Sequence, residues 1–253
     1  MFGKKKKSYH RKKIYCHTGK RRIFGEALIP EGEGPFPLVI YSHGCGYNTE
    51  VIPMRAFADQ GIATYFFDFC GGCPWSNSSG KVIDMSAMTE VEDLEAVFDT
   101  LKQQPFVDIS KIFLMGFDQG GFVSTVVAAK RPDEICGMIL FAPSYMLPEF
   151  QQVFLNNNPV PDTIRFNNMV VGRKYVEDVQ GYDIYEDMRK YSGPVLLYQG
   201  LEDEMVPLRY IQRAADCFTD VKCSILADAR HALQVDREAQ LEQETLEFIY
   251  NHL

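Results

Sequence analysis

Short apolar runs alternate with polar, glycine-containing segments along most of the chain. Their length and their Gly/Pro boundaries predict buried strands. Two runs on either side of Gly19 predict an opening antiparallel hairpin, at residues 14–17 and 23–29. Later strands are expected at residues 38–42, 62–69, 112–115, 135–141, 195–198 and 224–226.

Apolar residues recur at helical spacing between these strands. The clearest helix begins near Ser86 and places on one face the side chains of Val91, Leu94, Val97, Phe98 and Leu101. Other helices are expected from Asn48 or Thr49 to about residue 60, over residues 122–130, and over residues 237–252. This alternation indicates an α/β fold with a mostly parallel central sheet covered by helices on both faces.

Residues 144–192 interrupt the alternation. The segment is too long for a simple connection in a compact domain, and it is rich in phenylalanine and tyrosine. We interpret it as a lid inserted over the ends of the strands, within a single domain over residues 1–253. The alternative is that its aromatic side chains only form the lid's own core.

Composition excludes several function classes. A net charge of −8 with 24% charged residues is typical of a globular protein that does not bind nucleic acid. No apolar run reaches the length of a membrane span, and the basic residues 4–7 lack the apolar stretch of a secretion signal. Seven scattered cysteines then indicate reduced thiols in the cytoplasm. Cys70 and Cys73 form a C-x-x-C pair, but Pro74 follows and no second ligand pair is present, so we expect no metal and no cofactor.

The candidate chemistry centres on residues 112–121, IFLMGFDQGG. An apolar strand ends at one glycine and a helix starts after another, which resembles the G-x-S-x-G nucleophile elbow of α/β-hydrolases. Gly116 and Gly120 would let the strand and the helix approach closely. The residue at the tip is Asp118, where that motif has serine. Many α/β proteins contain a strand–glycine–helix turn, so this motif needs support from the rest of the chain.

Three further polar segments follow strands whose carboxyl ends should meet this elbow. They are residues 43–46 (HGCG), 200–207 (GLEDEMVP) and 228–231 (DARH). The chain order of nucleophile, acid and histidine is that of α/β-hydrolases. Of the five histidines, only His43 and His231 are expected at this edge of the sheet.

Together these segments resemble the cinnamoyl- and feruloyl-esterase-like group of α/β-hydrolases, within the serine hydrolases that include S9- and S33-type peptidases. The resemblance covers nearly the whole chain and rests on residues 42–46, 68–71, 119–121 and 203–207 together with the late histidine. It implies that His231 is the general base, that Asp203 orients it, and that the backbone N–H groups of Cys45 and Gln119 form the oxyanion hole. Two features depart from the group: Asp118 itself, and residues 228–230, where the group often has glycine beside the histidine.

These assignments leave alternatives open. Asp203 lies between Glu202 and Glu204 and could be a surface carboxylate. His231 could be an ordinary loop histidine, and His43 is expected in the substrate site as a support of the oxyanion loop. The aromatic residues expected to contact substrate are Tyr145, Tyr175, Tyr182 and Tyr185.

An aspartate at the elbow changes the reaction that is expected. Attack by a carboxylate on an acyl carbon would give an anhydride, whereas carboxylate nucleophiles in this fold displace at an alkyl carbon, as in epoxide hydrolases and haloalkane dehalogenases. Those families typically follow the aspartate with tryptophan or arginine, but here Gln119 follows it. We therefore favour a carboxylic-ester hydrolase scaffold for small acyl esters, aromatic ones included, in which Asp118 reduces or abolishes ester turnover.

Two alternatives remain. One is an Asp-nucleophile hydrolase of the epoxide or haloalkane type, with lid tyrosines activating the leaving group. The other is a non-catalytic ligand-binding protein that keeps the pocket. The expected partner is a small-molecule ester; neither nucleic acid nor membrane is expected, and a homodimer stays open.

Overall fold

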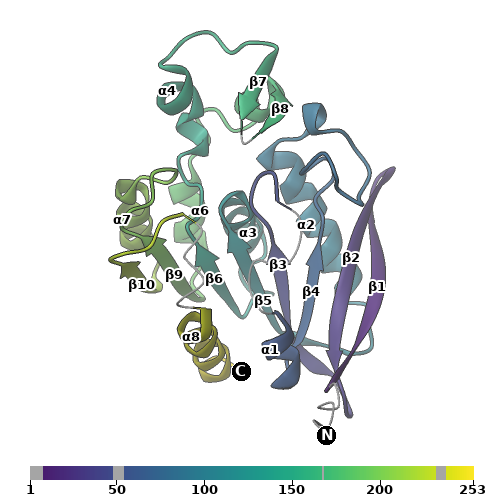
Figure 1. The fold of residues 1–253 in the computed structure, drawn as a ribbon. Coiled ribbons are helices and arrows are strands. Elements are labelled where there is room, and N and C mark those ends of the chain that lie inside the picture. Colours follow the sequence, from purple (N-terminus) through teal and green to yellow (C-terminus); the bar gives the residue numbers. More distant parts are fainter. Residues whose placement is uncertain (1–7, 48–53, 167, 232–237) are drawn as a thin grey trace, which may run out of the picture.

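The computed structural model describes residues 8–47, 54–166, 168–231 and 238–253. An eight-stranded sheet runs through the centre of the molecule, in the order β1-β2-β4-β3-β5-β6-β9-β10 (Figure 1). Its strands are β1 (Tyr9–Thr18), β2 (Arg21–Pro30), β3 (Phe36–Ser42), β4 (Ala63–Phe67), β5 (Val107–Phe117), β6 (Gly137–Phe141), β9 (Pro194–Gly200) and β10 (Asp220–Leu226).

The sheet is mostly parallel, as predicted. Only the edge hairpin β1–β2 and its pairing with β4 are antiparallel, while β4, β3, β5, β6, β9 and β10 run in one direction. Every residue of β4 and β6 is buried, because a strand covered on both faces has no solvent side. The carboxyl ends of the parallel strands therefore meet at one edge of the sheet.

Helices cover both faces of the sheet. One face carries α2 (Ala87–Leu101), α3 (Gln119–Lys130), α6 (Ile184–Lys190) and α7 (Leu208–Cys217), and the other carries α1 (Met54–Asp59) and α8 (Glu238–Asn251). Each face has its own apolar core, with Leu94 and Phe122 in one and Phe57 and Ile249 in the other. The α/β-hydrolase arrangement is thus confirmed in its layers. The expected caps at Asn48 or Thr49 and the expected helix start at residue 237 lie outside the described residues.

The segment predicted as a lid divides into two parts. Its first part contains α4 (Phe150–Leu155), the hairpin β7 (Thr163–Phe166) and β8 (Met169–Gly172), and α5 (Lys174–Glu177). This part lies beyond the carboxyl ends of the central strands (Figure 1), and we call residues 147–166 and 168–178 the lid. Its last helix, α6, instead packs against α3 and α7 in the helical layer. The rings of Phe150, Phe154, Phe166 and Tyr175 pack on one another, so most of these aromatic residues do form the lid's own core.

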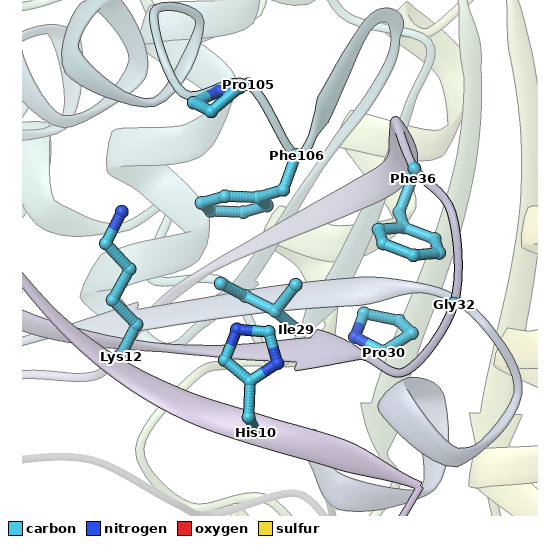
Figure 2. Close-up of a pocket in the computed structure, with 9 residues that line it drawn as sticks. His10, Lys12, Ile29, Pro30, Gly32, Phe36, Pro105 and Phe106 are labelled. Atoms are coloured by element: carbon cyan, nitrogen blue, oxygen red, sulfur yellow. The ribbon is translucent and has the colours of Figure 1, made fainter.

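A surface hollow of about 360 Å³ has His10, Lys12, Phe36 and Phe106 in its lining. Figure 2 shows how these side chains surround it. Phe36 is the first residue of β3, and Phe106 directly precedes β5. The hollow therefore lies at the amino ends of the parallel strands, away from the elbow. Within the described ranges, no helix combines the length and the apolarity that a bilayer crossing requires.

Candidate active site

Asp118 lies at a strained turn between β5 and α3. Its φ of 52° and ψ of −119° are unusual for a residue other than glycine. A Cβ atom on Gly116 would lie 2.5 Å from the carbonyl oxygen of Gly120, and one on Gly120 would lie 2.1 Å from that of Ser42. Both glycines are therefore required by the close approach of strand and helix, and the turn has the geometry of a nucleophile elbow.

The carboxylate of Asp118 is held at both oxygens. Oδ2 accepts a hydrogen bond from the backbone N–H of Cys45 at 3.0 Å, and Oδ1 accepts one from the hydroxyl of Ser144. His231 Nε2 lies 3.7 Å from Oδ1. The amino terminus of α3, which begins one residue later, favours a negative charge here. One carboxylate oxygen thus accepts the hydrogen bond of the Cys45 N–H, and the other oxygen faces the imidazole of His231.

Asp203 holds His231 from the opposite side. Its Oδ2 is 2.9 Å from Nδ1 of the imidazole, and its Oδ1 accepts backbone N–H groups from Met205 and Val206 at 2.8 and 2.9 Å. The Asp203 side chain is fully buried, whereas Glu202 and Glu204 are exposed. The structure therefore brings the predicted acid, and neither of its neighbours, to the histidine.

The two carboxylates control the protonation of the imidazole. Burial opposes a charge on His231, but the hydrogen bond to Asp203 and the charges of Asp118 and Asp203 together raise its pKa. Burial would likewise raise the pKa of Asp203, but the contact with His231 and the two backbone N–H donors lower it. A doubly protonated imidazole donates from both nitrogens and cannot act as a general base.

His43 supports the loop at residues 44–46, which follows β3. Its Nε2 accepts the backbone N–H of Phe69 at 3.1 Å, so the proton resides on Nδ1, which donates to the carbonyl of Gly44 at 2.8 Å. The ring is 1% exposed, and burial lowers its pKa. Since both nitrogens are engaged, His43 supports the loop that carries Gly44, and its contact with substrate stays a prediction.

One of the four candidate tyrosines reaches this site. The hydroxyl of Tyr175, on α5, donates to Gln119 Oε1 at 2.7 Å. The other three side chains are engaged elsewhere: Tyr145 with Thr125 at 2.8 Å, Tyr182 with Asp187, and the ring of Tyr185 3.8 Å from the Arg213 guanidinium. These three side chains pack against α3, α6 and α7, and their contact with substrate stays a prediction.

Two residues of the site were not found from the sequence. Glu90, on α2, is 1% exposed and accepts a hydrogen bond from Gln119 Nε2 at 2.8 Å. Its position one turn before Leu94, on the apolar face of the helix, was a usable signal. Ser144 follows β6, and nothing in its sequence context indicates that its hydroxyl meets Asp118.

Comparison with known proteins agrees with this architecture. Residues 35–175 match the family of serine aminopeptidases, S33. The chain is 25% identical over 195 residues to the uncharacterized peptidase YtmA of Bacillus subtilis (strain 168), covering 75% of this chain and 72% of that protein. It is 31% identical over 125 residues to monoglyceride lipase of Mus musculus, covering 48% of this chain but only 39% of the lipase. The solved structure of Est1E from Butyrivibrio proteoclasticus with bound ferulic acid superposes with a TM-score of 0.84 at 23% identity, over 94% of this chain and 98% of that one.

Proposed function

Because the chain belongs to the serine aminopeptidase S33 family of α/β-hydrolases, we propose that it carries a carboxylic-ester hydrolase site whose ester turnover is suppressed by Asp118. In this proposal His231 is the base, Asp203 orients it, and the backbone N–H groups of Cys45 and Gln119 form the oxyanion hole. As the first residue of α3, Gln119 has a backbone N–H without an intrahelical acceptor, which suits that role.

The observation that carries the proposal is the contact between Asp118 Oδ2 and the Cys45 N–H. In ester hydrolysis by this fold, such an N–H stabilises the oxyanion of the tetrahedral intermediate. Here a carboxylate oxygen of the protein already accepts it, and the other oxygen favours a protonated His231. Asp118 thus competes with the oxyanion and disables the base, while the machinery around it is that of an esterase.

The proposed substrates are small acyl esters, including aromatic ones. Support comes from the ferulic acid bound to a protein of the same fold and from the aromatic lid, in which Phe150 and Tyr175 meet edge to face at 5.4 Å. We further propose a cytoplasmic protein that acts on small molecules and uses no cofactor.

The direct test replaces Asp118 by serine. The Asp118→Ser protein should gain hydrolysis of short p-nitrophenyl esters, because a hydroxyl frees the Cys45 N–H and gives His231 a proton to remove. The gain should vanish in the Asp118→Ser/His231→Ala double variant. A folded Asp118→Ser protein with no more activity than the double variant would refute the proposal.

A second candidate is an Asp-nucleophile hydrolase. In Asp118, an N–H group holds Oδ2 while Oδ1 faces the histidine. A carboxylate in this arrangement could also displace a leaving group from an alkyl carbon. Against it, the Ser144 hydroxyl donates to Oδ1, the oxygen that would attack. A single turnover of an epoxide or haloalkane in ¹⁸O-labelled water decides between the two. Oδ1 would form an ester with the alkyl carbon as the carbon–halogen bond breaks and halide leaves, or as one epoxide C–O bond breaks and the alkoxide, still attached to the substrate, takes a proton. Water attack on the carbonyl carbon of the Asp118 ester would then release the alcohol or diol and leave ¹⁸O in that carboxylate.

The third alternative, a ligand-binding protein without catalysis, predicts a different result. Tight binding of an ester with no turnover in either the protein as it stands or the Asp118→Ser variant would favour it.

A further inference from the structure

The side chain of Gln119 is fixed from two sides. It is fully buried; its Oε1 accepts the Tyr175 hydroxyl at 2.7 Å, and its Nε2 donates to Glu90 Oε2 at 2.8 Å. The Tyr175 hydroxyl also interacts with the thiol of Cys45, where it opposes the effect of burial on the thiol pKa. One lid side chain therefore hydrogen-bonds to Gln119 and influences the thiol of Cys45, the two residues whose N–H groups are the proposed oxyanion donors.

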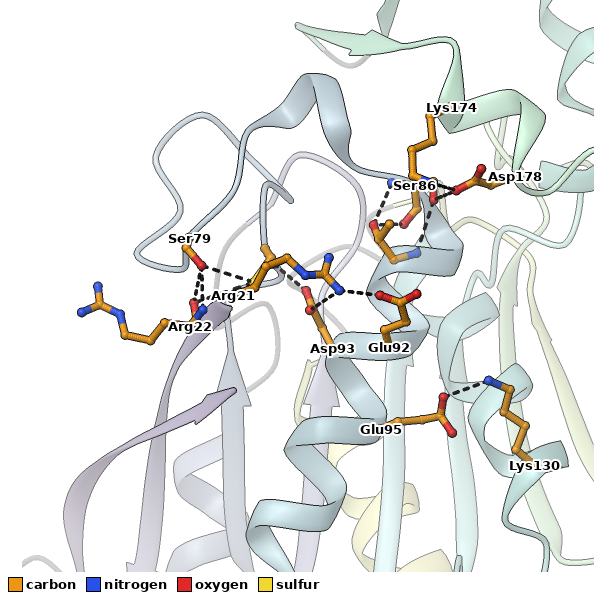
Figure 3. A network of polar contacts seen from close by, with 12 residues as sticks. Arg21, Arg22, Ser79, Ser86, Glu92, Asp93, Glu95, Lys130, Lys174 and Asp178 are labelled. Atoms are coloured by element: carbon orange, nitrogen blue, oxygen red, sulfur yellow. Dashed lines mark hydrogen bonds and ion pairs between the residues drawn. The ribbon is translucent and has the colours of Figure 1, made fainter. Parts of the chain in front are cut away.

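The elements that carry Tyr175 and Glu90 are joined to each other. Ser86 caps α2 by accepting the Thr89 backbone N–H at 3.3 Å, and its hydroxyl donates to Asp178 Oδ2 at 2.6 Å. Lys174, the first residue of α5, lies 2.5 Å from the same carboxylate. Figure 3 shows this group at the amino end of α2. The lid is thus anchored to the helix that supplies Glu90, and Gln119 lies between the two.

Burial and the nearby carboxylates favour the neutral form of Glu90. Burial raises its pKa well above the usual value, the charges of Asp93 and Asp118 add to that effect, and the hydrogen bond from Gln119 only partly opposes it. A neutral carboxyl can still accept from the Gln119 amide through its carbonyl oxygen.

The same helix face also secures the loop beneath His43. Asp93 accepts the backbone N–H of Cys70 at 2.8 Å. It also pairs with Arg21 at 3.3 Å (Figure 3). Phe69, the residue before Cys70, is the one whose N–H fixes His43. The Cys45 side of the site and the Gln119 side are therefore both supported from α2.

We infer that Tyr175 is a positioning residue: through Gln119 and Cys45 it sets the geometry of the oxyanion hole and links that geometry to the placement of the lid. The inference rests on the proposed function only where it names the two N–H groups as oxyanion donors. The contacts themselves exist with Asp118 in place.

The test removes one hydroxyl from each of two tyrosines. Tyr175→Phe deletes the contacts with Gln119 and Cys45. Tyr191→Phe is the matched control, because it deletes an equally buried hydroxyl that donates to the Ile135 carbonyl at 3.1 Å, outside the site. In otherwise unchanged protein, the amide proton of Cys45 should resonate downfield in NMR spectra, because it donates to a carboxylate. Tyr175→Phe should move this signal, and Tyr191→Phe should leave it in place.

Activity supplies the second measurement. In the Asp118→Ser background, Tyr175→Phe should lower kcat for p-nitrophenyl acetate about tenfold with little change in KM, which is less than the roughly 10²-fold or greater loss on deleting an oxyanion donor itself. Glu90→Gln keeps a neutral acceptor and should retain the activity, whereas Glu90→Ala should reproduce the loss.

The outcomes separate the two proposals. An inert Asp118→Ser protein whose Cys45 signal still responds to Tyr175→Phe would refute the esterase function and leave the positioning role standing. Equal responses of the Cys45 signal to Tyr175→Phe and Tyr191→Phe would overturn the positioning role. So would equal effects of the two substitutions on kcat.

Discussion

Replacing Asp118 by serine should lower the pKa of His231. The substitution removes a carboxylate oxygen 3.7 Å from Nε2 and leaves Asp203 as the remaining carboxylate on the ring. Two unit charges about 4 Å apart attract each other by roughly 1 kcal/mol in water and by roughly 4 kcal/mol at the effective dielectric of a protein surface. Because the His231 side chain is only 15% exposed, the attraction should exceed the water value.

The assay is an NMR titration of the His231 ring through the range in which imidazoles change charge. The midpoint should move to lower pH in Asp118→Ser. The Asp108→Ser protein, which loses an aspartate at the far end of β5, should titrate like the unchanged protein. An unchanged His231 midpoint in Asp118→Ser would refute the ion pair and, with it, the explanation of how Asp118 disables the base.

The raised pKa also links His231 to stability. The pKa of His231 is higher in the folded state than in the unfolded chain, where it is about 6.5. The protonated imidazole therefore contributes its full stabilisation at pH values below about 6.5, and this contribution is lost as pH rises through the pKa of the folded state. Between about pH 6.5 and the pKa of His231 in the folded state, the free energy of unfolding should therefore fall more in the unchanged protein than in Asp118→Ser.

Three further predictions concern single residues. In the Asp118→Ser background, Asp203→Asn should lower ester hydrolysis by several orders of magnitude, since an equivalent change in another triad costs roughly 10⁴-fold; an effect below about tenfold would place the acid elsewhere. The pKa of Glu90 is raised in the folded state, so the free energy of unfolding should fall as pH rises above the unfolded pKa of about 4.3, and Glu90→Gln should reduce that fall. Melting curves at several pH values measure it, with the exposed Glu247→Gln as control; if both variants followed the unchanged protein, the prediction would be wrong. Gly120→Ala should cost roughly 3 kcal/mol or more, because the new Cβ would lie 2.1 Å from a backbone oxygen; an unchanged denaturant midpoint would show that the elbow can relax.

The sequence predicts the sheet well because its signals are local. Apolar runs bounded by glycine and proline identify the strands, and β4 and β6 prove buried at every position. The elbow follows from Gly116 and Gly120, whose spacing reflects a steric requirement that the structure displays. The lid was harder to delimit, since α6 returns to the helical layer and only packing against α3 and α7 reveals it.

Side-chain direction is the feature of the site that the sequence encodes least. Tyr145, Tyr175, Tyr182 and Tyr185 look equivalent in the sequence, but only Tyr175 turns toward the elbow. The direction of Tyr175 depends on how the lid docks on α2, and the directions of the other three depend on packing among α3, α6 and α7, which no periodicity encodes. The state of Asp118 was equally hidden, because its contact with the Cys45 N–H joins residues 73 positions apart.

The central claim is that an intact esterase site lacks only its nucleophile, and covalent trapping with a fluorophosphonate tests it most directly. Such a reagent reacts with a serine that is activated by a base and faces an oxyanion hole. Intact-protein and peptide mass spectra of the Asp118→Ser protein should show one adduct per chain, located at position 118, and none in the unchanged protein or in Asp118→Ser/His231→Ala. A folded Asp118→Ser protein that forms no adduct, or forms it at another residue, would contradict the account.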